Sequence, residues 1–246
     1  MQPVAYDKMI EFEDSHFWFI ARERICLDLI DGIMNESVKR ILDYGCGTGK
    51  IAYLLQERYK DKEIYGADIS DVAVDYCRKR GLSNVFHLRE EKLPENTFGL
   101  IVCLDVLEHI QEDVEFLNQI KNLLSAGGRI FMAVPSYEFL WSGEDYVSNH
   151  ARRYTRRQLK KKITQAGFKI SKITYFNTFL FVPIVLVLLA KRLFLPKSMY
   201  ESDVKEVPRF LNILLTKIFV SERWFLKRAS FPYGASLLVI AQKEDK

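Results

Sequence analysis

Three alternating glycines, set between an apolar run and a helical run, constrain this chain more than any other feature. Residues 41–50 read Ile-Leu-Asp-Tyr-Gly-Cys-Gly-Thr-Gly-Lys, and a helical pattern resumes over residues 51–55. Glycine has no Cβ, so it takes positive φ and lets a ligand approach the backbone, while the first amides of a helix face an anionic group. The pattern predicts a strand, a tight loop and a helix N-terminus that bind a small cofactor.

The loop departs from the dinucleotide-binding fingerprint at Lys50, which stands where that fingerprint needs its third glycine. A pyrophosphate cradle is therefore disfavoured. A second apolar run, residues 64–68, ends in Asp68. A carboxylate at this distance can accept hydrogen bonds from both hydroxyls of a ribose. The alternative is that Asp68 only caps a helix beginning near Ser70, but the glycine loop before it favours the ribose contact.

Three further motifs follow in order: residues 93–102, 105–109 and 124–131. They are similar to the loop into a fourth strand, the helix start after it and the turn into a fifth strand. With the glycine loop they make the chain, over about residues 38–173, resemble the class I S-adenosylmethionine-dependent methyltransferases. Gly99 stands where the family usually has Asp after Phe, and that position is expected to be structural.

Strand-like and helix-like segments alternate from residue 40 to 134, which predicts βαβ units and an α/β fold. The resemblance implies a Rossmann-like, doubly wound sheet of seven strands in the order 3-2-1-4-5-7-6. We expect one methyltransferase domain with an N-terminal helical cap (1–37), a core (38–176 and 233–246) and an apolar helical insertion before the last strand (177–232).

Composition adds weaker constraints. The formal charge of +4 excludes neither an anionic acceptor nor a membrane surface. The cysteines, Cys26, Cys46, Cys77 and Cys103, include no Cys-x-x-Cys pair and no adjacent His ligand, so neither a zinc site nor a disulfide framework is expected. A reducing, cytoplasmic compartment fits this cysteine usage. The first nine residues hold no basic segment followed by an apolar run, so we expect no secretory signal.

The resemblance implies S-adenosyl-L-methionine as the cofactor. The glycine loop is expected to face its methionine part and Asp68 its ribose. Ile69 and Leu93 are expected to offer apolar surface to the adenine, and Glu90 stands where relatives often contact the adenine amine. The full expected set of cofactor residues is Asp43, Gly45, Cys46, Gly47, Gly49, Asp68, Ile69, Glu90, Leu93, Leu104 and Asp105.

Acceptor chemistry is expected in residues 135–154, which resemble a bacterial and archaeal methyltransferase subgroup with Trp-Ser-x-x-Asp and His-x-Arg-Arg-Tyr motifs. An Asp and a His a few residues apart suit a carboxylate-oriented imidazole base, here Asp145 and His150. His109 is the competing base. The alternative is that Asp145 and His150 only tie the loop to the domain. The residues expected to bind the acceptor are Trp141, Arg152, Arg153 and Tyr154, with the two arginines able to hold a phosphate or carboxylate.

The basic run 152–162, in which seven of eleven residues are Arg or Lys, raises the alternative of an RNA methyltransferase. Residues 104–107 lack the motif of base amino-methyltransferases, and no Pro-Cys nucleophile is present, so nucleic acid is the weaker prediction. A non-catalytic membrane adaptor is a further alternative. The intact glycine loop with Asp68 argues against it, because a fold without catalysis has no need of cofactor contacts.

The insertion carries two apolar segments. Residues 179–190 are uninterruptedly apolar and precede Lys191 and Arg192, and a second helix with a broad apolar face is expected after Pro208. The first run is short for crossing a bilayer and suits an in-plane position. We expect peripheral attachment to the cytoplasmic membrane face and a small or lipid-linked acceptor methylated on oxygen. The alternative is that both helices cover the core or a dimer interface, and the oligomeric state stays open.

Overall fold

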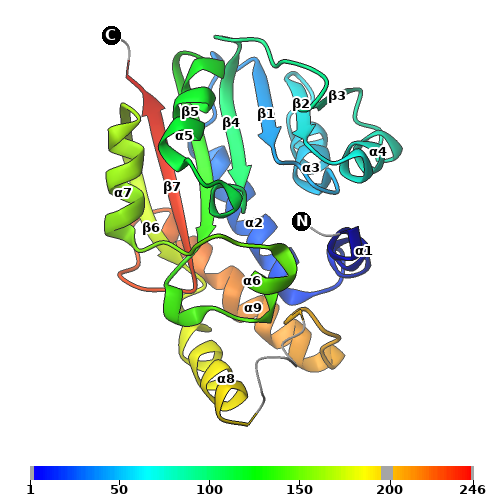
Figure 1. Cartoon of the computed structure of the whole chain (residues 1–246), viewed down its shortest axis with the longest axis vertical. Coiled ribbons are helices and arrows are strands. Elements are labelled where there is room, and N and C mark those ends of the chain that lie inside the picture. Colours follow the sequence, from blue (N-terminus) through cyan, green and yellow to red (C-terminus); the bar gives the residue numbers. More distant parts are fainter. Residues whose placement is uncertain (1–2, 195–201, 245–246) are drawn as a thin grey trace.

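The computed structural model describes residues 3–194 and 202–244, which build a seven-stranded sheet flanked by helices (Figure 1). The strands are β1 (Arg40–Tyr44), β2 (Glu63–Asp68), β3 (Asn84–His87), β4 (Phe98–Leu104), β5 (Leu124–Pro135), β6 (Phe168–Phe176) and β7 (Ser236–Lys243). Their order, β3-β2-β1-β4-β5-β7-β6, confirms the expected topology. The first five strands pair in parallel, and β7 is antiparallel to β5 and β6. Parts of the expected cap, insertion and last segment, namely residues 1–2, 195–201 and 245–246, lie outside the described residues.

The helices cover both faces of the sheet. They are α1 (Pro3–Phe12), α2 (Phe17–Asp31), α3 (Lys50–Arg58), α4 (Asp71–Lys79), α5 (Asp113–Leu123), α6 (Gly143–Ser148), α7 (Arg156–Gln165), α8 (Phe181–Phe194) and α9 (Arg209–Leu226), with 3₁₀ turns η1 (Leu107–His109) and η2 (Glu138–Leu140). In Figure 1, α5 and α7 lie in front of the sheet and α2 and α9 behind it, while α8 projects from the lower end. The insertion before β7 is therefore helical, as expected.

The middle of the sheet is buried on both faces. The β4 residues Leu100, Ile101, Val102 and Cys103 are at most 1% exposed, as the continuous apolar run of a covered parallel strand requires. Strand order reverses between β1 and β4, which lie side by side and are parallel. The connections leaving their carboxyl ends therefore diverge, and this is the edge at which open α/β sheets bind ligands.

Polar residues of α9 attach that helix to the rest of the domain. The Asn212 side chain accepts a hydrogen bond from the Phe17 amide at 2.8 Å and donates one to the Ser15 carbonyl at 2.7 Å. Near the other end of α9, Arg223 and Lys227 lie 3.4 and 3.2 Å from the carboxylate of Asp28 on α2. These polar side chains thus hold α9 against the N-terminal cap, which leaves apolar side chains of α9 facing outward.

Glu222 joins α9 to the end of β6. Its Oε1 accepts hydrogen bonds from the amides of Thr178 and Phe179, both at 2.7 Å, and the side chain is fully buried. Burial raises the pKa of this carboxyl to about 7. A raised pKa means that the folded protein binds this proton more tightly than the unfolded chain, so stability is lost as pH rises through the folded value.

We predict that Glu222→Gln is more stable than the parent at pH 8 and about equal to it at pH 5. Glutamine keeps a carbonyl acceptor for the two amides and never ionises, whereas the ionised Glu222 costs up to about 3 kcal/mol of unfolding free energy. Urea unfolding at both pH values measures the difference. The exposed Glu36→Gln serves as the control and should show no such pH dependence. A Glu222→Gln difference that is the same at both pH values contradicts the prediction.

Candidate active site

A cavity of about 960 Å³ lies at the carboxyl ends of β1 and β4. In Figure 1 the arrowheads of these strands point towards the half of the molecule that holds α1, α6 and α9. The cavity walls come from the glycine loop, the ends of β2 and β4, the segment after β5, the N-terminal helices and the insertion. It therefore brings the expected cofactor and acceptor segments to one space.

The glycine loop has the backbone that its sequence predicts. Gly45, Gly47 and Gly49 have φ of +72°, +55° and +74°, in the left-handed region that favours glycine. Gly49 caps α3, and the Asp43 carboxylate accepts a hydrogen bond from the Ala52 amide at 3.1 Å, which ties the end of β1 to that helix. The loop backbone thereby lines the cavity, while the Gly45 amide donates to the Ala67 carbonyl at 2.7 Å.

Asp68, at the end of β2, is buried and lines the same cavity. One of its oxygens accepts from the Gly47 amide and the other from the Ser70 amide, both at 3.0 Å. The Ser70 contact is the helix-start contact that was the alternative for this residue. Each carboxylate oxygen has a further lone pair, so the residue can serve both roles. A buried carboxylate beside glycine-loop amides fits the ribose of S-adenosylmethionine.

The N-terminal cap closes over the loop through contacts that sequence reasoning missed. Glu13 accepts a hydrogen bond from Thr48 and pairs with Arg80, and Lys50 pairs with Asp14. Thr48 and Glu13 both line the cavity. The two consecutive acids at residues 13–14 were the available sign of these contacts. Their partners lie far along the chain, and no local sequence pattern identifies them.

At the end of β4, Asp105 has φ of +55° and forms an ion pair with Arg22 of α2. The Arg22 side chain is only 10% exposed, and its guanidinium lies 5.0 Å from the ring centre of Trp18. Arg22 was also missed. Its position on the buried face of α2, with Ile25, Cys26 and Leu29, was the available signal, since an Arg on such a face needs a partner.

Other expected cofactor residues divide between the cavity and the surface. Leu104 and Cys46 line the cavity, as does Ile69, which is 53% exposed. Glu90 and Leu93 are not among the described residues that line it, and Leu88 takes that place. The adenine contact at Glu90 and Leu93 therefore stays a prediction, which the exposure of Glu90 after β3 disfavours.

The segment after β5 is organised around the buried carboxylate of Asp145. It accepts hydrogen bonds from the Ser142 amide at 2.7 Å, from Nδ1 of His150 at 2.8 Å and from two nitrogens of Arg153 at 2.8 and 2.7 Å. Burial opposes ionisation, but the hydrogen bonds from His150 and Arg153 outweigh it and lower the pKa of Asp145 to about 2. Asp145 is therefore an anion, and Nδ1 of His150 must be the donor in their hydrogen bond.

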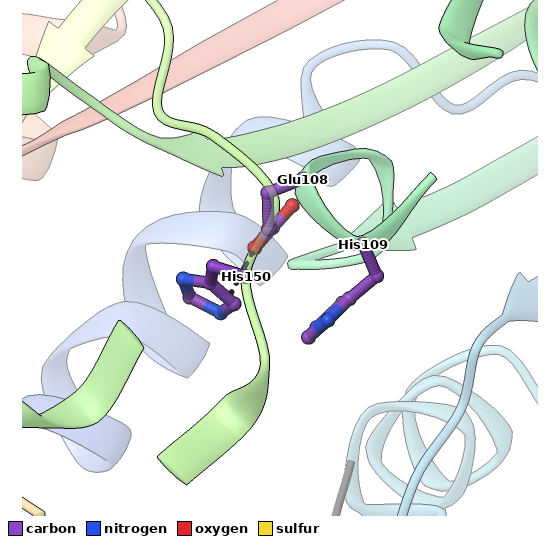
Figure 2. Close-up of side chains that lie close together, drawn as sticks. All are labelled: Glu108, His109 and His150. Carbon is purple, nitrogen blue, oxygen red and sulfur yellow. Dashed lines mark ion pairs between the residues drawn. The ribbon is translucent and has the colours of Figure 1, made fainter. Parts of the chain in front are cut away.

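Nε2 of His150 consequently faces the other way, towards Glu108, at 3.8 Å from its Oε1 (Figure 2). The ring of His109 lies 4.8 Å from that of His150, edge to face, and both side chains line the cavity. Burial and the neighbouring His150 lower the pKa of His109 to about 4. Burial raises the pKa of Glu108 well above its usual range. Both of the histidines considered as bases thus reach the cavity.

The expected acceptor-binding residues are used differently. Arg153 is committed to Asp145 and to the Ser136 carbonyl at 3.2 Å, while Arg152 lies 3.4 Å from Asp113. Tyr154 is buried at 2% exposure. Trp141, Arg152 and Tyr154 are absent from the described residues that line the cavity, as is all of α7. Arg153 does line the cavity, so the clamp for an anionic acceptor stays a prediction, which the contacts of both arginines with buried carboxylates disfavour.

Comparison with known proteins agrees with this geometry. A family model described as "Methyltransferase domain" matches residues 18–173. A ubiquinone biosynthesis O-methyltransferase of an Azoarcus species is 26% identical over 147 residues, 54% of this chain and 62% of that protein. An uncharacterised protein of Methanocaldococcus jannaschii is 24% identical over 204 residues, 80% of each. The matched segments span less than two thirds of the length of the first curated relatives.

Among solved structures, the plantazolicin methyltransferase BpumL, crystallised with a triazolic desmethylPZN analog and SAH, has a TM-score of 0.63 at 16% identity. The similarity covers 99% of this chain and 92% of that one. At this level of identity the likeness shows a shared fold.

The tight contact of the glycine loop with the end of β4 can be tested at Gly45. A Cβ there would lie 2.3 Å from the Val106 side chain, whereas one at Gly81, which also has positive φ, meets nothing within 4 Å. We predict that Gly81→Ala loses about 1–2 kcal/mol of unfolding free energy for the left-handed backbone alone. Gly45→Ala should lose at least about 1 kcal/mol more, because Val106 must move. Urea unfolding measures both, and equal losses would contradict the contact.

Proposed function

The chain belongs to the methyltransferase-domain family, and we propose that it transfers a methyl group from S-adenosylmethionine to an oxygen atom of a prenylated, hydroxylated ring. The observation that carries this proposal is the shared cavity: Asp68 and the glycine loop line it together with His150. In the reaction the sulfonium C–S bond breaks, its electrons stay on sulfur, and an oxygen lone pair forms the new C–O bond. The acceptor hydroxyl must lose its proton.

On the donor side, the residues of this chain hold and orient the cofactor. We assign the backbone of Gly45 and Gly47, where no Cβ blocks the approach, to the methionine part, and Asp68 to the ribose hydroxyls. Ile69 and Leu88 supply apolar surface for the adenine. Glu13 and Thr48, joined by a hydrogen bond, help to close the cap over this end and to exclude water. Positioning is the main task, because a methyl sulfonium is already an activated electrophile.

On the acceptor side, the Asp145–His150 pair activates the hydroxyl. Asp145 fixes the orientation of the imidazole through Nδ1, and Arg153 fixes Asp145. This leaves Nε2 as the electron-pair donor of a ring that lines the cavity. The Asp145–His150 pair therefore takes the proton from the acceptor oxygen, whereas Arg152 and Arg153 hold this loop in position.

The choice of a lipid-linked acceptor rests on the insertion. None of the described residues of α8 is buried, and Leu186, Leu193 and Phe194 are 61%, 78% and 82% exposed. On α9, Phe210 and Trp224 are 74% and 60% exposed. Since Pro183, Ile184 and Val187 also line the cavity, the apolar surface continues into the site. The relative named as a ubiquinone biosynthesis O-methyltransferase supports a prenylated ring as the acceptor class.

An apolar helix beside exposed cations suits a position in the plane of a membrane surface. Arg192 and Arg209 are exposed at the ends of α8 and α9. Within residues 3–194 and 202–244, no helix is both long and apolar enough to cross a bilayer. We propose that α8 and α9 attach to the membrane surface, so that the prenyl tail enters the cavity without leaving the lipid.

We predict that the donor and acceptor roles separate by mutation. Asp68→Ala should bind S-adenosylmethionine about 10- to 100-fold more weakly, since a charge-assisted hydrogen bond contributes about 1.5–3 kcal/mol. His150→Ala should keep the parent affinity but lose at least about 100-fold in transfer, the usual share of acid–base assistance. Calorimetry measures the first effect, and tritium transfer from methyl-labelled cofactor to farnesylated catechol measures the second. Equal loss of affinity and transfer in His150→Ala would indicate a structural role.

We also predict that the parent protein floats with vesicles of phosphatidylcholine and phosphatidylglycerol. The double variant Leu186→Asp, Leu193→Asp should stay in the soluble fraction, because it places two charges on the exposed apolar face of α8. Val72→Asp, which changes an exposed apolar residue of α4 outside the insertion, is the matched control and should float as the parent does. A parent protein that stays in solution, or a double variant that floats equally, overturns membrane attachment.

A further inference from the structure

Glu108 is a buried acid without a hydrogen-bond partner among the described residues. Its side chain is 0% exposed, and neither carboxylate oxygen has a hydrogen-bond partner among the residues that the structure describes. Leaving such a group unpaired is costly, so buried polar atoms are normally bonded and an exception calls for an explanation. A bound metal ion would explain the exception, because it would contact the carboxylate oxygens directly.

Two imidazoles stand beside this carboxylate. One ligand atom each from Glu108, His109 and His150 can be chosen so that all three lie within 4.8 Å of one another. Figure 2 shows the Glu108 carboxylate next to the ring of His150, and His109 follows Glu108 directly in the chain. In tetrahedral zinc sites the metal–nitrogen distance of ~2.0–2.1 Å sets ligand atoms ~3.3 Å apart, so modest side-chain rotations would complete the site.

The surroundings orient both imidazoles for metal binding. Nδ1 of His150 donates to Asp145, which Arg153 holds in turn. Nδ1 of His109 lies 3.4 Å from the Asn149 carbonyl. A ligating histidine almost always gives its other ring nitrogen to a carboxylate or a backbone carbonyl, which fixes the ring and its tautomer. Each histidine here therefore has that second contact and presents its remaining nitrogen.

We propose that Glu108, His109 and His150 bind one divalent transition metal, with zinc as the preferred ion, at the acceptor end of the cavity. Two imidazoles and one carboxylate are a ligand set of catalytic zinc sites, in which the fourth position stays open. Magnesium and calcium favour all-oxygen ligands and are disfavoured here. The cysteines gave no sign of this site, because it uses none of them.

This metal site deepens the proposed function and rests on it. His109 and His150 both line the cavity, so the open position of the metal faces the acceptor. An acceptor hydroxyl that binds the cation releases its proton to water and becomes an oxygen anion. That anion then takes the methyl group, and the C–S electrons remain on sulfur as before. In the metal-bound protein Nε2 of His150 is a ligand of the metal, and the metal, in place of a free imidazole, lowers the pKa of the acceptor hydroxyl.

A second group, Asp71, His87 and Glu90, also brings three possible ligand atoms together, but Asp71 and Glu90 are exposed. The ring nitrogens of the buried His87 also lack hydrogen-bond partners, but both acids of this group are readily solvated and offer no buried carboxylate to an ion. This group provides a matched control at a different place on the same chain.

The test uses the full chain without an affinity tag, after treatment with a chelator. Calorimetric titration with Zn²⁺, and visible absorption on titration with Co²⁺, should show one equivalent bound by the parent. His109→Ala should bind at least 10-fold more weakly, and Asp145→Asn, which changes the contact behind His150, about 10-fold more weakly. Asp71→Asn should bind as the parent does. Glu108→Gln, which keeps the shape of the side chain, should also weaken binding at least 10-fold.

Three results would overturn the site: no saturable binding by the parent, equal binding by the parent and His109→Ala, or loss of binding in Asp71→Asn. Methyl transfer to farnesylated catechol gives the second readout. Chelated parent should lose at least 10-fold in transfer and regain it with Zn²⁺, while its affinity for S-adenosylmethionine stays unchanged. Full transfer by metal-free protein overturns the metal role and leaves the proposed function, with His150 acting as a free imidazole. Metal binding without transfer in any form supports the metal site and removes the proposed function.

Discussion

The reversal of strand order between β1 and β4 is the constraint on which the rest of the structure depends. From β1 the chain winds outward through β2 and β3, then returns to β4 on the other side of β1. The connections after β1 and β4 consequently leave in different directions and cannot fill the space between them. The glycine loop and Asp105 lie at the two sides of that space. A cofactor-sized cavity follows from topology, and side chains decide what it binds.

Buried charges stabilise the walls of this cavity in pairs. Arg22 neutralises Asp105 at the end of β4, and Arg153 neutralises Asp145 after β5, where His150 also donates a hydrogen bond to Asp145. Removing one partner from such a pair leaves a buried charge and is strongly destabilising. The pairs therefore hold α2 and the loop after β5 at defined places around the cavity. Glu108 stands apart from these pairs, since neither of its oxygens has a hydrogen-bond partner among the described residues.

Much of the fold could be predicted from local sequence patterns. A helix, α9, begins directly after Pro208 as expected, and the sheet order agrees with the family resemblance. Strand and helix periodicity, proline and glycine act over a few residues, so a single sequence carries that information. The same is true of the glycine loop and Asp68, because a backbone at positive φ and a strand-end carboxylate are locally encoded.

The sequence by itself therefore determined the fold class, the glycine loop with Asp68 at the strand ends and the apolar character of the insertion. Only the tertiary structure decided how the residues after β5 are used. Arg152 and Arg153 read as ligands for an anion, yet Asp113 and Asp145 occupy them. Glu108 and His109 meet His150 only because the loop after β5 folds back onto η1, where the Ala151 amide donates to the Glu108 carbonyl at 2.8 Å. Such contacts depend on how distant segments pack, and no pattern of neighbouring residues specifies them.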